Sequence, residues 1–72
     1  MTHPTTIPIT VDGFPEEVGA GMTLAQLLAA RGEPEKVVMV EHNGVYVPSS
    51  RLAAVPLSPG DRVELILPAF GG

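Results

Sequence analysis

The residues with the clearest capacity for chemistry are the two glycines that end the sequence, Gly71 and Gly72. A terminal carboxylate is unreactive toward nucleophiles until it becomes an acyl-adenylate or another activated ester. To be activated, it must enter the active site of an adenylating enzyme. Glycine suits a narrow channel because it has no side chain and adopts backbone angles that other residues avoid. The pair therefore indicates an end group that a partner enzyme modifies.

The position of the pair strengthens this interpretation. Glycines at a chain end also occur in frayed termini, but these two follow the most apolar strand pattern in the sequence after a short stem. The segment from Pro68 to Gly72 can span about 17 Å when extended, at roughly 3.3–3.6 Å per residue. Pro68 stiffens its base, which lowers the entropy lost on capture. We expect one domain over residues 1–72 with a flexible tail over 68–72.

Composition excludes several other kinds of function. The chain has 72 residues and no cysteine, so it has no thiolate with which to carry sulfur, attack a substrate or bind a metal. The net charge of −4 argues against nucleic-acid binding, which needs a basic surface. No apolar run approaches the roughly 18 residues that span a membrane. The polar start, Met1 to Thr6, does not resemble a signal peptide, and we expect a cytoplasmic protein.

Local patterns predict six elements that alternate with turns. Apolar residues alternate over 7–11 and again over 63–67, which is typical of strands with one buried face. Asp12-Gly13 and Asn43-Gly44 are strong hairpin signals, and they predict return strands over 14–18 and 45–47 and a strand over 37–41. A helix over Thr23–Arg31 is predicted by a capping box, by leucines at helical spacing and by the stop signals Gly32 and Pro34. One irregular or 3₁₀ turn is expected over 49–55.

This order predicts an α+β fold in which one main helix covers a mixed sheet of about five strands. The last strand is the most apolar, so we place it in the centre of the sheet beside the first strand. That arrangement is the ubiquitin-like β-grasp.

An apolar patch beside the tail is the second candidate feature. If Val63, Leu65 and Leu67 face the helix, Ile66 points to the open side of the sheet. Val37 and Met39 share the face of Glu41 and are expected to point the same way. Such a patch would dock a partner, and Glu64, with Arg62 beside it, would steer a basic one. The predicted docking residues are Ile66, Met39, Glu64, Pro68 and Phe70.

The remaining polar residues do not form a catalytic pattern. His3 and His42 lack the spacing of a metal site, and His42 before Asn43 is interpreted as turn chemistry. The acidic pairs Glu16-Glu17 and Glu33/Glu35 are expected to be solvated. The glycines Gly19 and Gly21 are too weak a signal for phosphate binding, and Ser49 and Ser50 lack a base. We predict no catalytic residue, no metal and no cofactor bound by this chain.

The motifs together resemble the ThiS/MoaD family of ubiquitin-like sulfur carriers over nearly the whole chain. The resemblance rests on the helix start Met22-Thr23-Leu24, the hairpin 40–44 with Pro48, the segment Leu57-Ser58-Pro59-Gly60-Asp61-Arg62-Val63-Glu64 and the final Gly71-Gly72. The segment 43–48 and the length are more similar to ThiS, whereas Pro68 before the last residues is more similar to MoaD.

The resemblance implies a carrier that is not itself an enzyme. A ubiquitin-activating-type adenylyltransferase would use ATP to adenylylate the carboxylate of Gly72, and a persulfide from a sulfur donor protein would displace AMP to leave a thiocarboxylate. The sulfur would then pass to a thiazole synthase in thiamin biosynthesis. In the MoaD alternative, it would pass to the large subunit of molybdopterin synthase. Other sulfur-transfer pathways, a ubiquitin-like protein modifier and a non-carrier β-grasp interaction domain are the remaining hypotheses.

Overall fold

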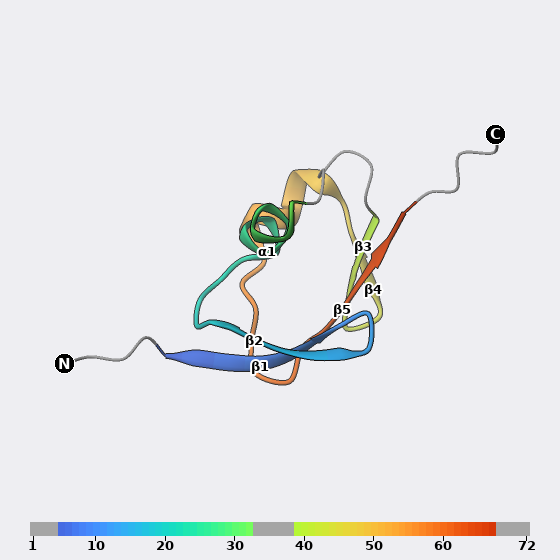
Figure 1. Cartoon of the computed structure of the whole chain (residues 1–72). Coiled ribbons are helices and arrows are strands. Elements are labelled where there is room, and N and C mark those ends of the chain that lie inside the picture. The colour runs from blue at the N-terminus through green and yellow to red at the C-terminus, as the bar shows by residue number, and fades with distance from the viewer. Residues whose placement is uncertain (1–4, 33–38, 68–72) are drawn as a thin grey trace.

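The protein folds as a five-stranded mixed sheet with one main helix, as the sequence predicts (Figure 1). The computed structural model describes residues 5–32 and 39–67. The strand order is β2-β1-β5-β3-β4, with β1 and β5 parallel and the other neighbours antiparallel. The elements are β1 Thr6–Val11, β2 Phe14–Gly19, α1 Leu24–Arg31, β3 Met39–His42, β4 Val45–Val47, the 3₁₀ helix η1 Ser49–Ala54 and β5 Arg62–Ile66. The β-grasp prediction is therefore confirmed, including the central position of the last strand.

Both hairpins close through the turns that the sequence predicts. Asp12 and Gly13 have φ values of 52° and 84°, and Asn43 and Gly44 have 52° and 83°. Positive φ at both central residues defines a type I′ turn, whose twist matches that of the flanking strands. Two short sequence signals thus fix the register of β1 with β2 and of β3 with β4.

The helix begins and ends where its capping residues predict. The side chain of Thr23 accepts a hydrogen bond from the backbone N–H of Gln26, and the side chain of Gln26 accepts one from the backbone N–H of Thr23. Gly32 ends the helix with φ of 73°, a value that suits glycine because it carries no Cβ. The described part of the chain contains no helix long and apolar enough to cross a membrane.

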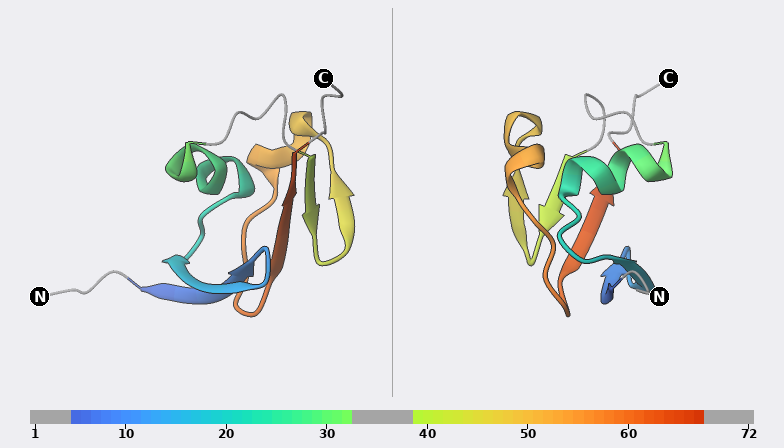
Figure 2. Two further views of the ribbon diagram at one scale, coloured as in Figure 1. Left: turned by 45° about the vertical axis from the view of Figure 1, so that its right-hand side comes forward. Right: turned by 90° about the vertical axis from the view of Figure 1, so that its left-hand side faces the viewer.

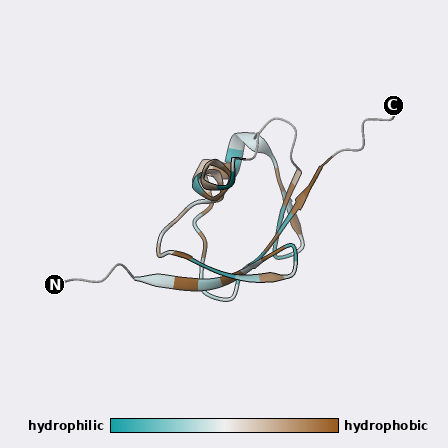
Figure 3. Ribbon diagram, viewed as in Figure 1, coloured by the Kyte–Doolittle hydropathy of each residue, from teal (hydrophilic) through white to brown (hydrophobic). Residues whose placement is uncertain are grey.

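The core lies between one face of the sheet and the layer formed by α1 and η1 (Figure 2). Figure 3 shows the hydrophobic residues concentrated along β1 and toward the end of β5. The core takes alternate residues from the strands and three leucines from α1. Its members are Ile7, Ile9, Val11, Val18, Leu24, Leu27, Leu28, Val40, Val47, Leu52, Leu57 and Val63.

Pro8 lies inside β1 without costing the sheet a ladder hydrogen bond. The backbone N–H groups of Thr10 and Asp12 donate to β5 and its approach, so the nitrogen of Pro8 also points to that side. The pairing with β5 starts only at Thr10, and Pro8 therefore precedes it. A strand tolerates proline at such a position because no ladder hydrogen bond needs its missing donor.

One expectation for the last strand is wrong. Leu67 was expected to face the helix with Val63 and Leu65, but β5 ends at Ile66 and Leu67 is 64% exposed. Val63 is buried and Leu65 is partly buried. The alternation breaks because β5 ends at Ile66, and beyond the end of a strand the side chains are no longer held to alternate faces.

Candidate functional site

The expected reactive tail starts directly after the central strand. Gly71, Gly72, Phe70 and Pro68 lie outside the described residues, so their roles stay predictions. The described chain ends at Leu67, one residue beyond β5. Since β5 is hydrogen-bonded to β1 on one side and to β3 on the other, the expected tail follows the central strand of the sheet.

Ile66 and Met39 form the predicted apolar pair on the open face of the sheet. They are direct partners in the antiparallel ladder of β5 and β3, so their side chains lie on the same face. Ile66 is 39% exposed and Met39 is 47% exposed, whereas their neighbours Val40 and Leu65 face the helix side. The open face thus presents an apolar surface next to the point where the tail leaves. Val37, which was expected to join this surface, lies outside the described residues.

A second row of side chains crosses the same face. Glu64 is the direct partner of Glu41, and Glu41 is the direct partner of Tyr46. Tyr46 is 54% exposed. Two carboxylates on directly opposite residues repel each other and give this part of the face a negative potential. Glu64 was predicted from the sequence, but Glu41 and Tyr46 were not singled out as docking residues.

We define the docking surface as Met39, Ile66, Glu41, Glu64 and Tyr46. Beyond this surface, Arg62 borders a hollow of about 250 Å³ on the β1 side of the sheet, lined also by Pro8, Ile9, Thr10, Pro15 and Gly60. Arg62 makes no ion pair with any residue in the described ranges. The open face therefore runs from a cationic end through a pair of carboxylates to an apolar end beside the tail.

Asp61 is the one polar residue found buried within the described ranges, with 8% of its surface exposed. Its Oδ2 atom accepts hydrogen bonds from His42 Nε2 at 2.6 Å and from the Ser58 N–H at 2.8 Å, and its Oδ1 accepts one from Asn43 Nδ2 at 3.1 Å. The Asn43 side chain in turn accepts a hydrogen bond from the Arg62 N–H. This network ties the β3–β4 turn to the start of β5. The interpretation of His42 and Asn43 as turn chemistry thus agrees with the geometry, and Asp61 supplies the acceptor that joins them.

The network sets the protonation of Asp61. Burial raises the pKa of the carboxyl, but the hydrogen bonds from His42, Ser58 and Asn43 and the charge of His42 together hold that pKa below its ordinary value of 3.8. A folded-state pKa below the unfolded value stabilises the fold above the unfolded pKa. The contribution is lost as the pH falls through the lower folded pKa.

We expect Asp61→Asn to lower the free energy of unfolding by about 1–3 kcal/mol at neutral pH, because an amide leaves buried donors unpaired. The wild-type protein should lose stability below about pH 4 as Asp61 becomes protonated, and the variant should lack this part of the pH dependence. Urea unfolding followed by circular dichroism between pH 3 and pH 7 measures both effects. Glu17→Gln on the exposed β2 edge is the control and should change stability little. An Asp61→Asn variant as stable as the control would contradict the role of the network.

The other polar residues considered in the sequence do not form a metal site or a catalytic site among the described residues. Among the described residues, no group of three or more His, Cys, Asp or Glu side chains is placed to hold a metal ion. Glu16 pairs with Arg31 of α1 at 2.7 Å, which ties β2 to the helix. Glu17 is exposed on β2. Ser49 and Ser50 begin η1 on the surface.

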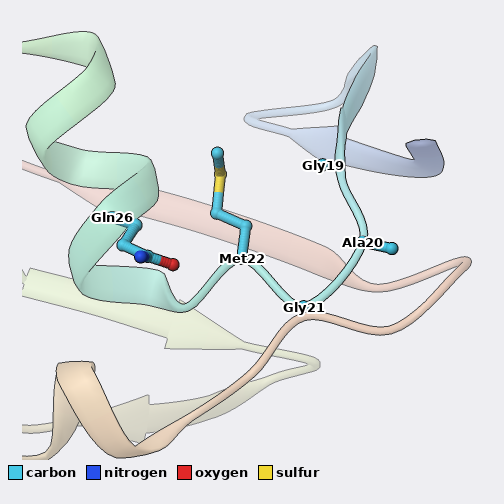
Figure 4. Close-up of a pocket in the computed structure, with 5 residues that line it drawn as sticks. All are labelled: Gly19, Ala20, Gly21, Met22 and Gln26. Atoms are coloured by element: carbon cyan, nitrogen blue, oxygen red, sulfur yellow. The ribbon is translucent and has the colours of Figure 1, made fainter. Parts of the chain in front are cut away.

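Gly19 and Gly21 line an open hollow before the helix, together with Ala20, Met22 and Gln26 (Figure 4). Three donors at the start of the helix are engaged: Met22 N–H donates to the Gly19 carbonyl, Thr23 N–H to the Gln26 side chain and Leu24 N–H to the Val55 carbonyl. Since a phosphate site at a helix N-terminus needs free amide donors, this geometry does not favour one here.

The comparisons with known proteins agree with the fold. The model of the ThiS family matches residues 6–72. The crystal structure of a thiamine biosynthesis protein (ThiS) from Geobacter metallireducens is similar with a TM-score of 0.80 and 29% sequence identity, covering 92% of this chain and 100% of that one. The solution structure of a thiamine biosynthesis protein from the same organism has a TM-score of 0.76 at 29% identity, with 92% and 88% covered. No curated protein sequence gives a significant match.

Proposed function

Because this chain belongs to the ThiS family, whose members are small sulfur carriers of thiamine biosynthesis rather than enzymes, we propose that it carries sulfur as a thiocarboxylate on Gly72. The observation that supports this proposal most is the family match, which continues through residue 72 and so includes both glycines. The absence of cysteine agrees with it, since a carrier without a thiol must hold sulfur on another group.

The proposed chemistry takes place in partner enzymes. A carboxylate oxygen of Gly72 attacks the α-phosphate of ATP, and pyrophosphate leaves. The terminal sulfur of a protein persulfide then attacks the acyl carbon of the adenylate, and AMP leaves. A thiol breaks the resulting S–S bond, taking the donor sulfur into a disulfide and releasing the thiocarboxylate on Gly72. We assign every proton transfer to the partners, because the carboxylate of Gly72 would react inside their active sites.

In this proposal the chain itself binds the partner enzyme and presents the tail to the partner's active site. The docking surface, with Met39 and Ile66 at its apolar end, lies beside the last residues of β5. A ubiquitin-activating-type adenylyltransferase that covers this surface would have the tail within reach of its active site, since Pro68 to Gly72 can extend about 17 Å. The carboxylates of Glu41 and Glu64 favour a basic partner surface. A thiazole synthase would use the same face when it accepts the sulfur.

A reconstitution tests the proposal. We expect incubation with ATP and a ubiquitin-activating-type adenylyltransferase to give the AMP adduct of the full chain. Addition of a persulfide donor should convert it to a product in which sulfur replaces one oxygen. Intact-mass spectrometry follows both steps. Samples without ATP are the control and should keep the starting mass. If no adduct forms with adenylyltransferases that act on other ThiS proteins, the proposal is wrong.

The destination of the sulfur is tested separately. Addition of a thiazole synthase with the substrates that accept the sulfur should consume the thiocarboxylate and release the carboxylate form, whereas a molybdopterin synthase large subunit with its own substrate should leave it intact. The reverse result would move the chain to the molybdopterin branch. Covalent conjugates that contain Gly72 joined to lysine would instead support a protein modifier.

A further inference from the structure

The two hairpins of the sheet are geometrically equivalent but differ at one position. Each closes through a type I′ turn with nearly identical φ values. The second residue after the first turn is Pro15, the partner of Thr10, and the second residue after the other turn is Tyr46, the partner of Glu41. Both β2 and β4 are edge strands. Pro15 and Tyr46 therefore occupy matching places on opposite edges of the sheet.

At both places the backbone points away from the sheet. The residues that flank a two-residue turn form a hydrogen-bonded pair, so the residue after them directs its N–H and C=O outward. The bonds beyond each hairpin agree with this alternation. Thr10 donates to the Asp61 carbonyl on the β5 side, and Asn43 donates to the Arg62 carbonyl. The outward position at β2 thus lacks a donor because it is proline, whereas the one at β4 keeps the N–H of Tyr46.

Only one of the two edge strands of the sheet, β2, carries features that prevent another strand from adding to it. On β2, Pro15 removes the outward donor and Glu16 and Glu17 add charge, which are the usual means of preventing strand addition. β4 reads Val-Tyr-Val without a charge or a proline, and Val45 and Tyr46 are both more than half exposed. Within the described ranges, β4 pairs with β3 alone. Its outer backbone groups are therefore available to an added strand.

The position and the short length of β4 indicate which kind of partner strand could pair with it. A second copy is disfavoured because each chain carries a net charge of −4 and a three-residue strand buries far less than the roughly 1,200 Å² of a stable interface. In contrast, the side chain of Tyr46 continues the row of Glu64 and Glu41 on the docking surface. A partner that covers this surface therefore reaches the β4 edge.

We propose that a short extended segment of the activating enzyme pairs with β4 through the backbone N–H and C=O of Tyr46, so that docking uses strand addition as well as side-chain contact. This inference rests on the proposed function. The segment is uncharged and apolar where it adjoins Val45 and Tyr46. It is only a few residues long, since Pro48 follows β4 and offers no donor.

Two variants that both remove the aromatic ring separate the backbone from the side chain. Tyr46→Ala keeps the outward N–H, and Tyr46→Pro removes it at a place where Pro15 shows that the fold accepts proline. We expect Tyr46→Pro to bind the adenylyltransferase about tenfold more weakly than Tyr46→Ala, as the loss of one backbone hydrogen bond predicts. Circular dichroism confirms that both fold. Equal affinities would overturn the strand addition while leaving the proposed function intact, and failure of the wild-type chain to bind would overturn both.

Hydrogen exchange of the wild-type chain gives a second test without mutation. The Tyr46 amide should exchange rapidly in the free protein and slow at least tenfold in the complex. The outward amide of Glu17 on the β2 edge is the matched control and should exchange at the same rate in both states. An unchanged Tyr46 rate would contradict the proposal even if Tyr46→Pro failed to fold.

Discussion

Deletion of Gly71 and Gly72 is expected to abolish thiocarboxylate formation without changing the fold. The buried core residues found in the described ranges lie between Ile7 and Val63, and glycine has no side chain to bury, so we expect the free energy of unfolding to stay the same. The chemistry should stop because the new terminus is two residues shorter, which removes about 7 Å of reach, and because its last residue is Phe70, whose ring would have to pass the channel. The rate of AMP-adduct formation, followed by intact-mass spectrometry, should fall by more than about a hundredfold.

The control for this deletion is a chain that lacks Thr2 and His3, which shortens the protein equally at its other end. It should be adenylylated at the wild-type rate. Adenylylation of the chain that ends at Phe70 at a comparable rate would contradict the role assigned to the two glycines.

Ile66→Asp is expected to weaken binding to the adenylyltransferase by about 30-fold or more. The substitution places a carboxylate beside Met39 in the apolar part of the docking surface and two residues along β5 from Glu64. Burial of an unpaired charge in an interface costs about 2 kcal/mol or more, which corresponds to this change in affinity. Isothermal titration calorimetry measures it. The melting temperature should fall only slightly, because Ile66 is already 39% exposed in the free protein.

Phe14→Asp is the matched control for this variant. Phe14 is the most exposed large apolar residue found in the described ranges, at 71%, and it lies on β2 at the other edge of the sheet. Its replacement by Asp adds the same charge without touching the docking surface, so affinity should stay within about twofold of the wild type. If both variants weakened binding equally, general charge repulsion rather than contact at Ile66 would be responsible.

The sequence predicts the local features of this fold well because each has a local cause. Asp12-Gly13 and Asn43-Gly44 adopt positive φ through their own conformational preferences, and Thr23 and Gln26 cap the helix within a single turn. The place of the last strand also follows from its composition, since a strand rich in apolar residues is favoured in the centre of a sheet.

The features that the sequence did not reveal depend on register between distant strands. The row of Glu64, Glu41 and Tyr46 appears only when β5, β3 and β4 are aligned. The Asn43-Gly44 turn does place Tyr46 opposite Glu41, so one half of this row could be found from the hairpin alone. Asp61 was named only as part of the motif over residues 57–64, although its carboxylate joins His42 and Asn43 from 19 and 18 positions away. Leu67 was assigned to the buried face because alternation says nothing about where strand pairing stops.

The strand β5 is held in place by its neighbours, whereas its open face is exposed to a partner. β5 is held between β1 and β3, and the buried network of Asp61 ties its start to the β3–β4 turn. The open face of the same strand carries Glu64 and Ile66, which lead along β5 toward the tail. A partner bound to this face therefore contacts the one strand whose end continues into the two glycines.

We propose that the sulfur is carried on the terminal carboxyl group of Gly72. Fragmentation of the sulfurated protein in a mass spectrometer tests it most directly, because the extra mass is assigned to a residue. We predict that the C-terminal fragments that contain Gly72 carry one sulfur in place of one oxygen, and that fragments ending before Gly72 keep their unmodified masses. Sulfur found on an internal fragment, with an unchanged mass at Gly72, would contradict the account.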